Sequence, residues 1–246
     1  MNTFFKNIFQ QITASVLFAV LLPFTALIAF ILFVILRENP FFLQDRGLTL
    51  SKGKVKIIKF KTLESKFTQS RKKNNNIFYK DELSGGVNRF TSLLRRTGFD
   101  ELPQLINIAK GEMAFVGPRP FMKDDLEIMK SDFSILYNLR NELNCKPGLT
   151  GLWQLLGKRE NGIYDLLLYD NLYDQSKSFI LDIKIIFVTL PYSFFAYNSD
   201  SIIKGRRSFF GNVVSKENRA KIRNAVIKFL GIENKEAVMR IKLKSC

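Results

Sequence analysis

The stretch SVLFAVLLPFTALIAFILFVIL, residues 15–36, contains no charged residue and decides where the chain can fold. As a straight helix, Val16–Leu36 would reach about 32 Å at ~1.5 Å per residue, which is long enough to cross a bilayer. A secretory signal fits poorly, because the run is long and no small-residue cleavage site ends it. A soluble helix is rarely this apolar on all sides. The sequence therefore predicts a membrane-inserted helix within residues 1–38.

Pro23 lies inside this helix and leaves two topologies open. An interior proline removes one backbone hydrogen bond and kinks or breaks a helix. One topology is a kinked spanning helix, in which Thr25 satisfies a freed carbonyl. The other is a helix–break–helix that enters one leaflet and returns, leaving both ends in the cytoplasm. The basic residues that follow the segment place the C-terminal part inside, but Lys6 alone does not fix the N-terminus.

The charge of the chain is strongly positive and unevenly placed. Its 246 residues include 38 Lys and Arg against 22 Asp and Glu, a net charge of +16. Residues 52–80 hold ten bases and one acid, and residues 197–246 hold twelve bases and four acids. Residues 81–196 are nearly neutral, with thirteen bases and fifteen acids. Two basic blocks of this kind favour anionic partners, such as phosphates or anionic lipid headgroups.

The chain contains no histidine, which excludes whole classes of chemistry. Ser-His-Asp triads, His-paired cysteine nucleophiles, HExxH zinc sites and Cys₂His₂ fingers all need histidine. The two cysteines, Cys145 and Cys246, cannot make a Cys₄ site and do not suggest a disulfide framework. A base that works at neutral pH must therefore be a carboxylate, lysine, tyrosine or cysteine.

Behind the membrane segment, the patterns predict mostly helix with a small β element. Alternating apolar and basic residues over Val55–Leu63 indicate a strand, and the polar residues 64–88 indicate an exposed loop. Capping residues and helical spacing predict the helices. They are Ser92–Thr97 capped by Thr91 and closed by Gly98, Glu101–Lys110 capped by Asp100, Asp124–Asn144, Ile163–Tyr173, Phe179–Phe195 and the moderately amphipathic Asn218–Leu230.

The candidate chemistry is concentrated in FDELPQLINIAKGEMAFVGPRP, residues 99–120. Taken singly, Asp100 reads as a helix cap, Glu101 as a first-turn acid and Arg119 as a surface ion-pair partner. Together they indicate more. A helix N-terminus suits a phosphate, an ionised aspartate can attack phosphorus, and a glutamate can hold Mg²⁺. An arginine between two prolines presents a pre-organised fork to phosphate oxygens.

This segment resembles the signature of the monotopic bacterial sugar transferases, the phosphoglycosyl transferases that begin capsule, exopolysaccharide, O-antigen and N-glycan assembly. Other segments resemble the family in the same order, so that the resemblance covers about residues 12–192. They are NPFFLQDRG (39–47), KFKTL (59–63), NRFTSLLRRTG (88–98), KPGLTGLWQ (146–154) and the run from Asp170 to Thr189. Lys61 stands where the family usually has arginine, and Phe99 where it usually has leucine.

The resemblance implies a reaction. Family members transfer a sugar 1-phosphate from a UDP-sugar to polyprenyl phosphate, releasing UMP. On matching positions, Asp100 is the nucleophile that takes the phospho-sugar as a covalent intermediate, and Glu101 binds Mg²⁺. Further residues are implied to shape the phosphate and nucleotide site: Lys59, Arg119, Lys146 and Asp182, together with Arg159, which is favoured over Lys158. The identity of the sugar is not legible in these motifs.

The resemblance also implies an architecture: a mainly α fold with a small β-hairpin, interfacial amphipathic helices and a re-entrant membrane helix broken at Pro23. Residues 39–196 are then the catalytic domain, on the cytoplasmic face of the bacterial inner membrane. Residues 197–246 are a basic extension outside the family core, either a solvated tail or a contact with anionic lipid. An oligomer stays open.

A different class of function is a membrane-tethered nucleic-acid binder, since the first basic block interleaves aromatic residues with its cations. Against this interpretation, neither a helix-turn-helix nor an aromatic ribonucleoprotein motif is present in the sequence. The transferase interpretation therefore expects a UDP-sugar, a polyprenyl phosphate and lipid as partners, and no nucleic acid.

Overall fold

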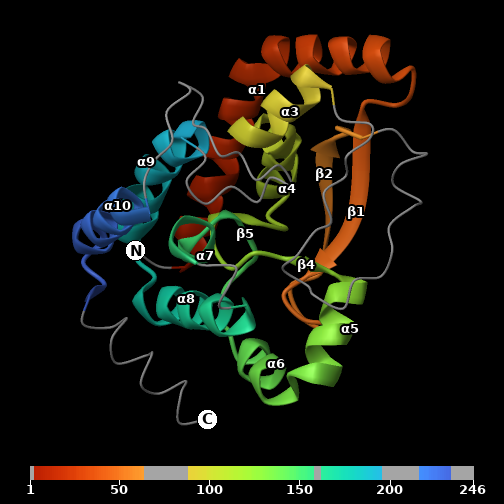
Figure 1. Cartoon of the computed structure of the whole chain (residues 1–246). Helices are drawn as coiled ribbons and strands as arrows, with labels where there is room; N and C mark the ends of the chain where they lie inside the picture. The colour runs from red at the N-terminus through yellow and green to blue at the C-terminus, as the bar shows by residue number, and fades with distance from the viewer. Residues whose placement is uncertain (1–2, 64–87, 158–161, 196–215, 234–246) are drawn as a thin grey trace.

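The computed structural model describes residues 3–63, 88–157, 162–195 and 216–233. Figure 1 shows helices around two small sheets, which confirms the predicted mainly α fold with a small β part. The helices are α1 (Thr3–Leu36), α3 (Arg89–Thr97), the 3₁₀ helix η1 (Phe99–Gln104), α4 (Leu105–Ala109), α5 (Lys123–Asp132), α6 (Ser134–Asn141), α7 (Leu152–Leu156), α8 (Gly162–Ser176), α9 (Phe179–Phe195) and α10 (Lys216–Leu230). The strands are β1 (Phe41–Gly47), β2 (Val55–Phe60), β3 (Ala114–Val116), β4 (Phe121–Met122) and β5 (Gly148–Thr150).

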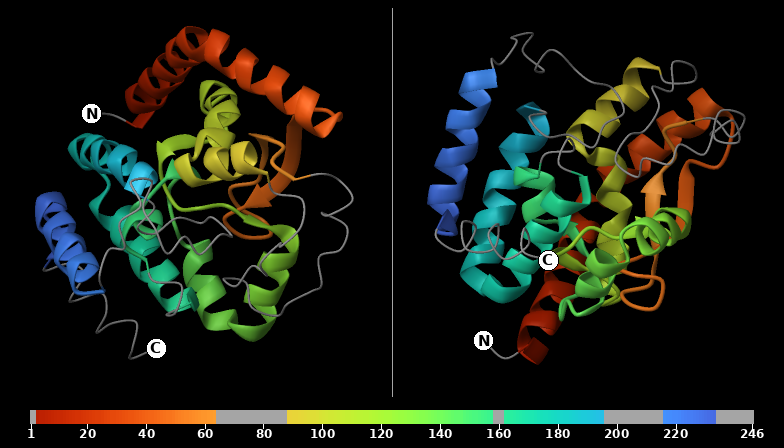
Figure 2. Two further views of the ribbon diagram at one scale, coloured as in Figure 1. Left: turned by 45° about the horizontal axis from the view of Figure 1, so that its top comes forward. Right: turned by 60° about the horizontal axis from the view of Figure 1, so that its bottom comes forward.

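Helix α1 contains the apolar stretch and is long and apolar enough, over Phe4–Leu36, to cross a membrane by length and composition. It runs without interruption through Pro23, so the predicted break is instead a bend, visible near the middle of the helix in Figures 1 and 2. The proline removes the donor to the carbonyl of Ala19, four residues earlier, which bends a helix without ending it. Thr25 Oγ1 donates to the carbonyl of Leu22 at 2.9 Å, rather than to the carbonyl that Pro23 frees.

Both halves of α1 pack on the body of the protein. Under the first half lies a cluster that joins Ala14 to Ile57 of β2 and Ile108 of α4. Under the second half lies another, which joins Leu32 to Leu94 of α3. The opposite side of α1 is apolar and exposed along its whole length. One side of the helix is therefore covered by the body of the protein, and the apolar opposite side is left exposed.

The two ends of α1 are also fixed to the same body. Near the first turn, Lys6 Nζ lies 2.6 Å from Asp182 Oδ2 of α9. Just beyond the last turn, Glu38 forms an ion pair with Lys61, which follows β2. The bend and the two ion pairs thus hold both ends of α1 against the same body.

The β-hairpin carries the first of the two sheets. β1 and β2 are antiparallel from Phe41 opposite Phe60 to Arg46 opposite Val55, and β4 pairs with the other edge of β1. The strand predicted over Val55–Leu63 is confirmed as β2, ending at Phe60. The second sheet is a short parallel pair, β3 with β5. The first sheet thus brings β4, from the middle of the sequence, onto the hairpin.

Two predicted caps are wrong. α3 begins earlier than predicted, because Asn88 and Thr91 exchange the two hydrogen bonds of a capping box and make Asn88 the N-cap. Gly98 closes this helix as predicted, with a positive φ of 76° that favours glycine. Asp100 caps nothing: it lies inside η1, which follows Gly98 directly and leads into α4. Pro103 within η1 has no N–H to offer to a longer α-helix.

The helix predicted over Asp124–Asn144 is also wrong, since the structure divides it into α5 and α6. Phe133, with φ −137° and ψ 50°, leaves the helical region between them. The apolar residues of the predicted helix still belong to one core, in which α5 and α6 pack against α7, α8 and α9. The loop predicted over residues 64–88 lies almost wholly outside the described residues, of which it shares only Asn88.

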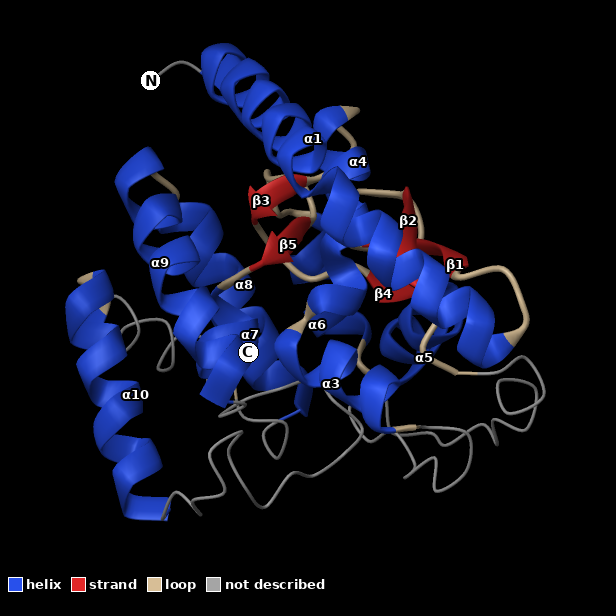
Figure 3. Cartoon of the chain, turned by 90° about the horizontal axis from the view of Figure 1, so that it is seen from above, coloured by secondary structure: helices blue, strands red, loops and turns tan. Residues whose placement is uncertain are grey.

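Helices α8, α9 and α10 complete the body and confirm three predicted helices. α9 has the predicted bounds and exposes Ile180, Ile183 and Phe187. Its Phe179 ring meets the ring of Phe9 of α1 edge-on at 5.7 Å, so that the exposed apolar sides of the two helices adjoin. α10 lies against α9 at the edge of the molecule, as Figure 3 shows from above.

Candidate functional site

One face of the hairpin supplies cations to the candidate site. Side chains alternate between the two faces of a sheet, and opposite partners share a face. The register pairs Phe42 with Lys59 and Gln44 with Ile57, and so puts Lys59, Gln44 and Arg46 on one face. Arg46 is oriented there by Gln44, whose Oε1 accepts from Nε at 2.9 Å and from Nη2 at 2.7 Å.

The 3₁₀ helix η1 supplies the carboxylates. It begins immediately after the left-handed Gly98 and carries Asp100 and Glu101 in its first turn. The ring of Phe99 packs edge-on against Phe24 of α1, with 5.6 Å between the ring centroids. The acid pair therefore directly follows Phe99, which packs on helix α1. Its contact there is Phe24, the residue after Pro23.

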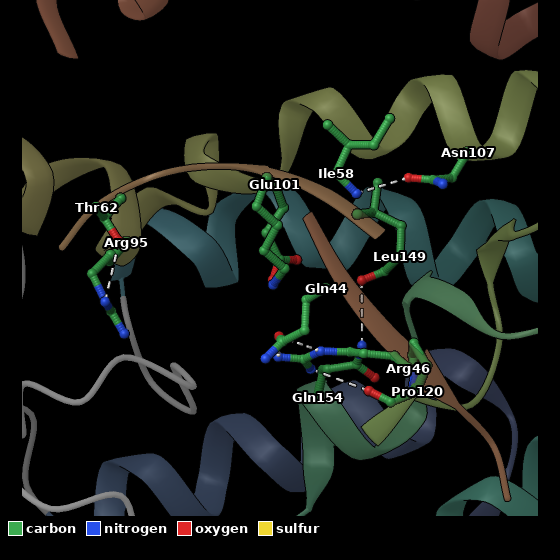
Figure 4. A network of polar contacts seen from close by, with 11 residues as sticks. Gln44, Arg46, Ile58, Thr62, Arg95, Glu101, Asn107, Pro120, Leu149 and Gln154 are labelled. Atoms are coloured by element: carbon green, nitrogen blue, oxygen red, sulfur yellow. Dashed lines mark hydrogen bonds and ion pairs between the residues drawn. The ribbon is translucent and has the colours of Figure 1, made fainter. Parts of the chain in front are cut away.

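Asn107 fixes η1 and α4 against the hairpin. Its Nδ2 donates to the carbonyl of Lys56 at 2.8 Å, and its Oδ1 accepts from the N–H of Ile58 at 3.1 Å. Its Nδ2 also lies 2.7 Å from Glu112 Oε2. The bonds to Lys56 and Ile58 hold β2 through the two residues that flank Ile57. Figure 4 shows the bond to Ile58. The amide thus sets the distance between the strand that carries the lysine and the helix that carries the acids.

Between these elements lies a small polar pocket. Its lining combines cations, an acid and an amide: Arg46, Ile57, Lys59, Glu101, Gln104, Arg119, Pro120, Gly148 and Leu149. Glu101 forms an ion pair with Lys59, and Figure 4 shows Glu101 reaching toward Gln44 and Arg46 on the hairpin. The pocket is small and partly open to solvent, and its lining of cations and an amide suits an anionic group such as a phosphate.

The loop that carries Arg119 is held by backbone contacts. A Cβ on Gly117 would lie 2.3 Å from the carbonyl oxygen of Lys146, and one on Gly148 would lie 2.1 Å from the nitrogen of Gly117. Only glycine allows the two segments to approach so closely. Arg46 Nη1 donates to the carbonyl of Pro120 at 3.2 Å, which ties the same loop to the hairpin.

A buried arginine supports this loop from below. Arg140 Nη2 donates to the carbonyl of Arg119 at 2.5 Å, and its guanidinium lies over the ring of Phe121. Arg140 Nη1 is 3.2 Å from Asp170 Oδ2, and both side chains are almost completely buried. Burial raises the pKa of Asp170, while the charge of Arg140 opposes the shift. This pair anchors α6 to α8 and to the loop above.

The electrostatics of the site are those of crowded, poorly solvated charges. Burial, and then the neighbouring Glu101, raise the pKa of Asp100 to about 6, against the opposing charges of Lys59 and Arg95. Burial lowers the pKa of Lys59, and the attraction of Glu101 opposes that shift. Perturbed pairs of this kind are typical of catalytic sites. Asp100 does not line the pocket itself; it lies next to Glu101 within reach of Lys59 and Arg95.

The structure brings together four of the residues implied by the family resemblance and separates others. Asp100, Glu101, Lys59 and Arg119 gather at or beside the pocket. Lys146 instead donates from Nζ to the carbonyl of Gly111 at 2.7 Å, beyond the end of α4.

Two more of the implied residues lie away from the pocket, and one is not described. Besides pairing with Lys6, Asp182 has its Oδ1 2.8 Å from the hydroxyl of Tyr173. Pro23 marks the bend of α1. Arg159 and Lys158 lie outside the described residues.

Two lining residues, Arg46 and Gln104, were not predicted from the sequence. A strand over residues 41–47 with its register would have placed Arg46 on the face of Lys59. Gln104 follows Glu101 by three residues, a spacing that puts both side chains on one side of a 3₁₀ helix and also of an α-helix. This spacing is the signal that could have found Gln104.

The donor set fits Mg²⁺. Asp100 and Glu101 offer the hard carboxylate oxygens that this ion prefers. Among the described residues, no group of three or more His, Cys, Asp or Glu could hold a metal. Mg²⁺ sites commonly combine one or two carboxylates with substrate phosphates and water, and the adjacent cations suit a phosphate.

The fold and the site define a membrane-associated protein whose acid pair adjoins a cationic pocket next to an apolar helix. Comparison with known proteins gives the family: the profile described as "Bacterial sugar transferase" matches residues 1–196, and the chain belongs to this family. The match leaves out α10.

Three relatives illustrate the similarity. The chain is 42% identical over 100 residues to the exopolysaccharide production protein ExoY of Sinorhizobium fredii. It is 40% identical over 103 residues to the undecaprenyl-phosphate galactose phosphotransferase of Salmonella typhimurium. It is 41% identical over 111 residues to the UDP-glucose:undecaprenyl-phosphate glucose-1-phosphate transferase of Klebsiella pneumoniae. These matches cover 41%, 42% and 42% of this chain, and 42%, 20% and 23% of the respective relatives.

Proposed function

We propose that the protein transfers a sugar 1-phosphate from a UDP-sugar to polyprenyl phosphate and releases UMP. The observation that carries this proposal is the juxtaposition of Asp100 and Glu101 with three cations, Arg46, Lys59 and Arg119, beside the apolar helix α1. The cations suit a diphosphate, and the helix suits a substrate with a lipid tail. The names of the Salmonella and Klebsiella relatives, which specify undecaprenyl phosphate, support the same reaction.

The first step is attack of an ionised Asp100 oxygen on the β-phosphorus of the UDP-sugar. A bond forms between the carboxylate and phosphorus, the bond to the bridging oxygen breaks, and UMP leaves with the electron pair. The product is an acyl phosphate that carries the sugar. In the second step a phosphate oxygen of polyprenyl phosphate attacks the same phosphorus, and the Asp100 carboxylate leaves. Neither step requires a proton from a histidine.

The pocket residues lower the barrier by charge and position. Arg119, held through its carbonyl by Arg140, and Arg46, oriented by Gln44, face the oxygens of the transferred group. Such pre-organised cations stabilise the negative charge of the transition state. Glu101 would hold Mg²⁺, which when bound offsets the repulsion between an anionic nucleophile and an anionic substrate.

We propose that α1 is re-entrant, with both ends on the cytoplasmic face of the bacterial inner membrane. The ion pairs at its two ends and the packing of both halves on one body support this topology. The exposed apolar sides of α1 and α9 would enter the lipid, and basic residues of 197–246 would contact anionic headgroups, at about 1 kcal/mol each. The phosphate of a polyprenyl carrier would then lie at the depth of the pocket.

The proposed function is tested with purified protein, Mg²⁺, polyprenyl phosphate and a panel of UDP-sugars, with UMP release as the readout. We expect release with at least one donor and its loss in Asp100→Asn. Asp125→Asn, which removes a carboxylate from the first turn of α5, is the matched control and retains activity. Absence of UMP with every donor, or full activity of Asp100→Asn, would contradict the proposal.

A further inference from the structure

Gln104 is a buried amide placed by η1 on the same side as Glu101. In a 3₁₀ helix, side chains three residues apart eclipse one another. Both residues accordingly line the pocket, together with Arg46, Lys59 and Arg119. The Gln104 side chain belongs to a residue that is only 3% exposed, so its conformation is set by the packing around it.

The Nε2 group of Gln104 has no hydrogen-bond partner among the described residues. A buried donor without a partner is uncommon and destabilises a fold. Other buried polar atoms that lack such a bond, such as those of the Arg140–Asp170 pair, do not line the pocket. Gln104 thus keeps an unpaired N–H donor at the pocket although this lowers the stability of the fold. Such a donor is typical of a group whose hydrogen-bond partner is a ligand.

The chemistry around Gln104 identifies the missing acceptor. The cations that share its pocket are donors only and cannot accept its N–H, and Glu101, the acid in the same lining, is paired with Lys59. The acceptor that three cations and an amide would share is an anionic oxygen, such as an oxygen of a diphosphate. We propose that the carboxamide of Gln104 donates a hydrogen bond to a diphosphate oxygen of the UDP-sugar. This inference rests on the proposed function and adds a substrate-contacting residue to it.

The test compares Gln104→Leu, which keeps the approximate size but removes the amide, with the wild-type enzyme. Four quantities are measured: the thermal shift produced by UDP, the KM for the UDP-sugar and the KM for polyprenyl phosphate in UMP release, and the melting temperature of the ligand-free protein. Losing a hydrogen bond to a charged group weakens UDP binding and raises KM by about 10–100-fold. The KM for polyprenyl phosphate stays unchanged, because the contact is assigned to the nucleotide diphosphate. The melting temperature stays equal or rises, because a buried donor without a partner is removed.

The matched control is Asn171→Leu, which removes an amide that bonds the carbonyl of Leu167 in its own helix α8. It leaves the KM and the UDP shift unchanged. If Gln104→Leu melts lower and binds UDP as the wild type does, the residue is structural and the inference is overturned. A raised KM for polyprenyl phosphate alone would overturn it in favour of the acceptor.

Failure of the proposed function gives a different pattern. A wild type that is stabilised by UDP but releases no UMP, with Gln104→Leu losing the stabilisation, would contradict the transferase and leave the Gln104 contact intact. A wild type that UDP does not stabilise would overturn the contact itself.

Discussion

The raised pKa of Asp100 makes the first chemical step depend on pH in a range where an ordinary aspartate would not titrate. With a pKa of about 6, about ten in eleven of these carboxyls are ionised at pH 7 and about one in eleven at pH 5. Because only the carboxylate attacks phosphorus, the rate of UMP release falls about tenfold between these two values. At the ordinary value of 3.8 it would change by about a tenth or less.

The assay is a single turnover with UDP-sugar and Mg²⁺ and without polyprenyl phosphate, since a phosphate monoester has its own pKa near ~6. Arg95→Gln is the diagnostic variant. Arg95 lowers the pKa of Asp100 by its charge, so its removal moves the acid limb of the profile to higher pH. Lys130→Gln, an exposed change on α5, leaves the limb where it is. Because Mg²⁺ bound at the acid pair lowers the pKa of Asp100 in both proteins, the limbs are compared at one Mg²⁺ concentration. A limb that Arg95→Gln does not move would refute the reasoning.

The raised pKa of Asp100 also determines how the free energy of unfolding changes with pH. A carboxyl whose pKa is higher in the folded than in the unfolded state favours the protonated form on folding. The free energy of unfolding therefore falls as the pH rises from about 3.8 to about 6 through this group, and stays lower above that range. Asp100→Asn, which is neutral at every pH, removes this dependence and does not lower stability at pH 7. Loss of its activity then cannot be attributed to unfolding.

Three further predictions concern the framework around the site. Asn107→Leu removes the amide that joins β2 to α4 and lowers the free energy of unfolding by about 2–4 kcal/mol, as measured by denaturant unfolding in detergent. Asp170→Asn leaves the charge of Arg140 buried without its partner and costs about 3–5 kcal/mol in the same measurement, while Arg140→Met with Asp170→Leu recovers most of it. Deletion of residues 197–246 removes α10, whose Ile227 is buried in the core. The core beneath α10 is then exposed, and the melting temperature falls.

Each of these predictions has an outcome that contradicts it. Wild-type stability of Asn107→Leu would mean that the hairpin and α4 hold together without the amide. If the double variant is as unstable as Asp170→Asn, the ion pair itself stabilises the fold. The loss in Asp170→Asn would then not come only from the unpaired charge of Arg140. An unchanged melting temperature after deletion would mean that α10 does not pack as part of the body.

Much of the fold could be predicted from local patterns. Three local patterns each predict one structure, and the structure agrees with them: the apolar run predicts the helix α1, the alternation predicts the strand β2, and Gly98 predicts the end of α3. The patterns failed where tertiary contacts or competing caps decided. Asp100 looked like a cap, but Gly98 and Pro103 leave only a 3₁₀ helix in that place. Phe133 continued a helical spacing, yet the chain bends there so that both flanking helices reach one core.

The candidate site was predictable as far as its segments, and not in its geometry. Sequence motifs placed Asp100, Glu101 and Arg119 in one neighbourhood, which the pocket and the charge interactions support. The inclusion of Arg46 depends on strand register, which no local pattern in the sequence fixes. The side chain of Lys146 donates to the carbonyl of Gly111, beyond the end of α4, and no local pattern in the sequence encodes this backbone contact.

The most direct measurement is the mass of the protein, and of its peptide containing Asp100, after incubation with UDP-sugar and Mg²⁺ in the absence of polyprenyl phosphate. Attack by Asp100 predicts a gain of one sugar phosphate on that peptide, equal in amount to the UMP released, and its disappearance when polyprenyl phosphate is added. An unmodified Asp100 in an enzyme that releases UMP only when both substrates are present would contradict it.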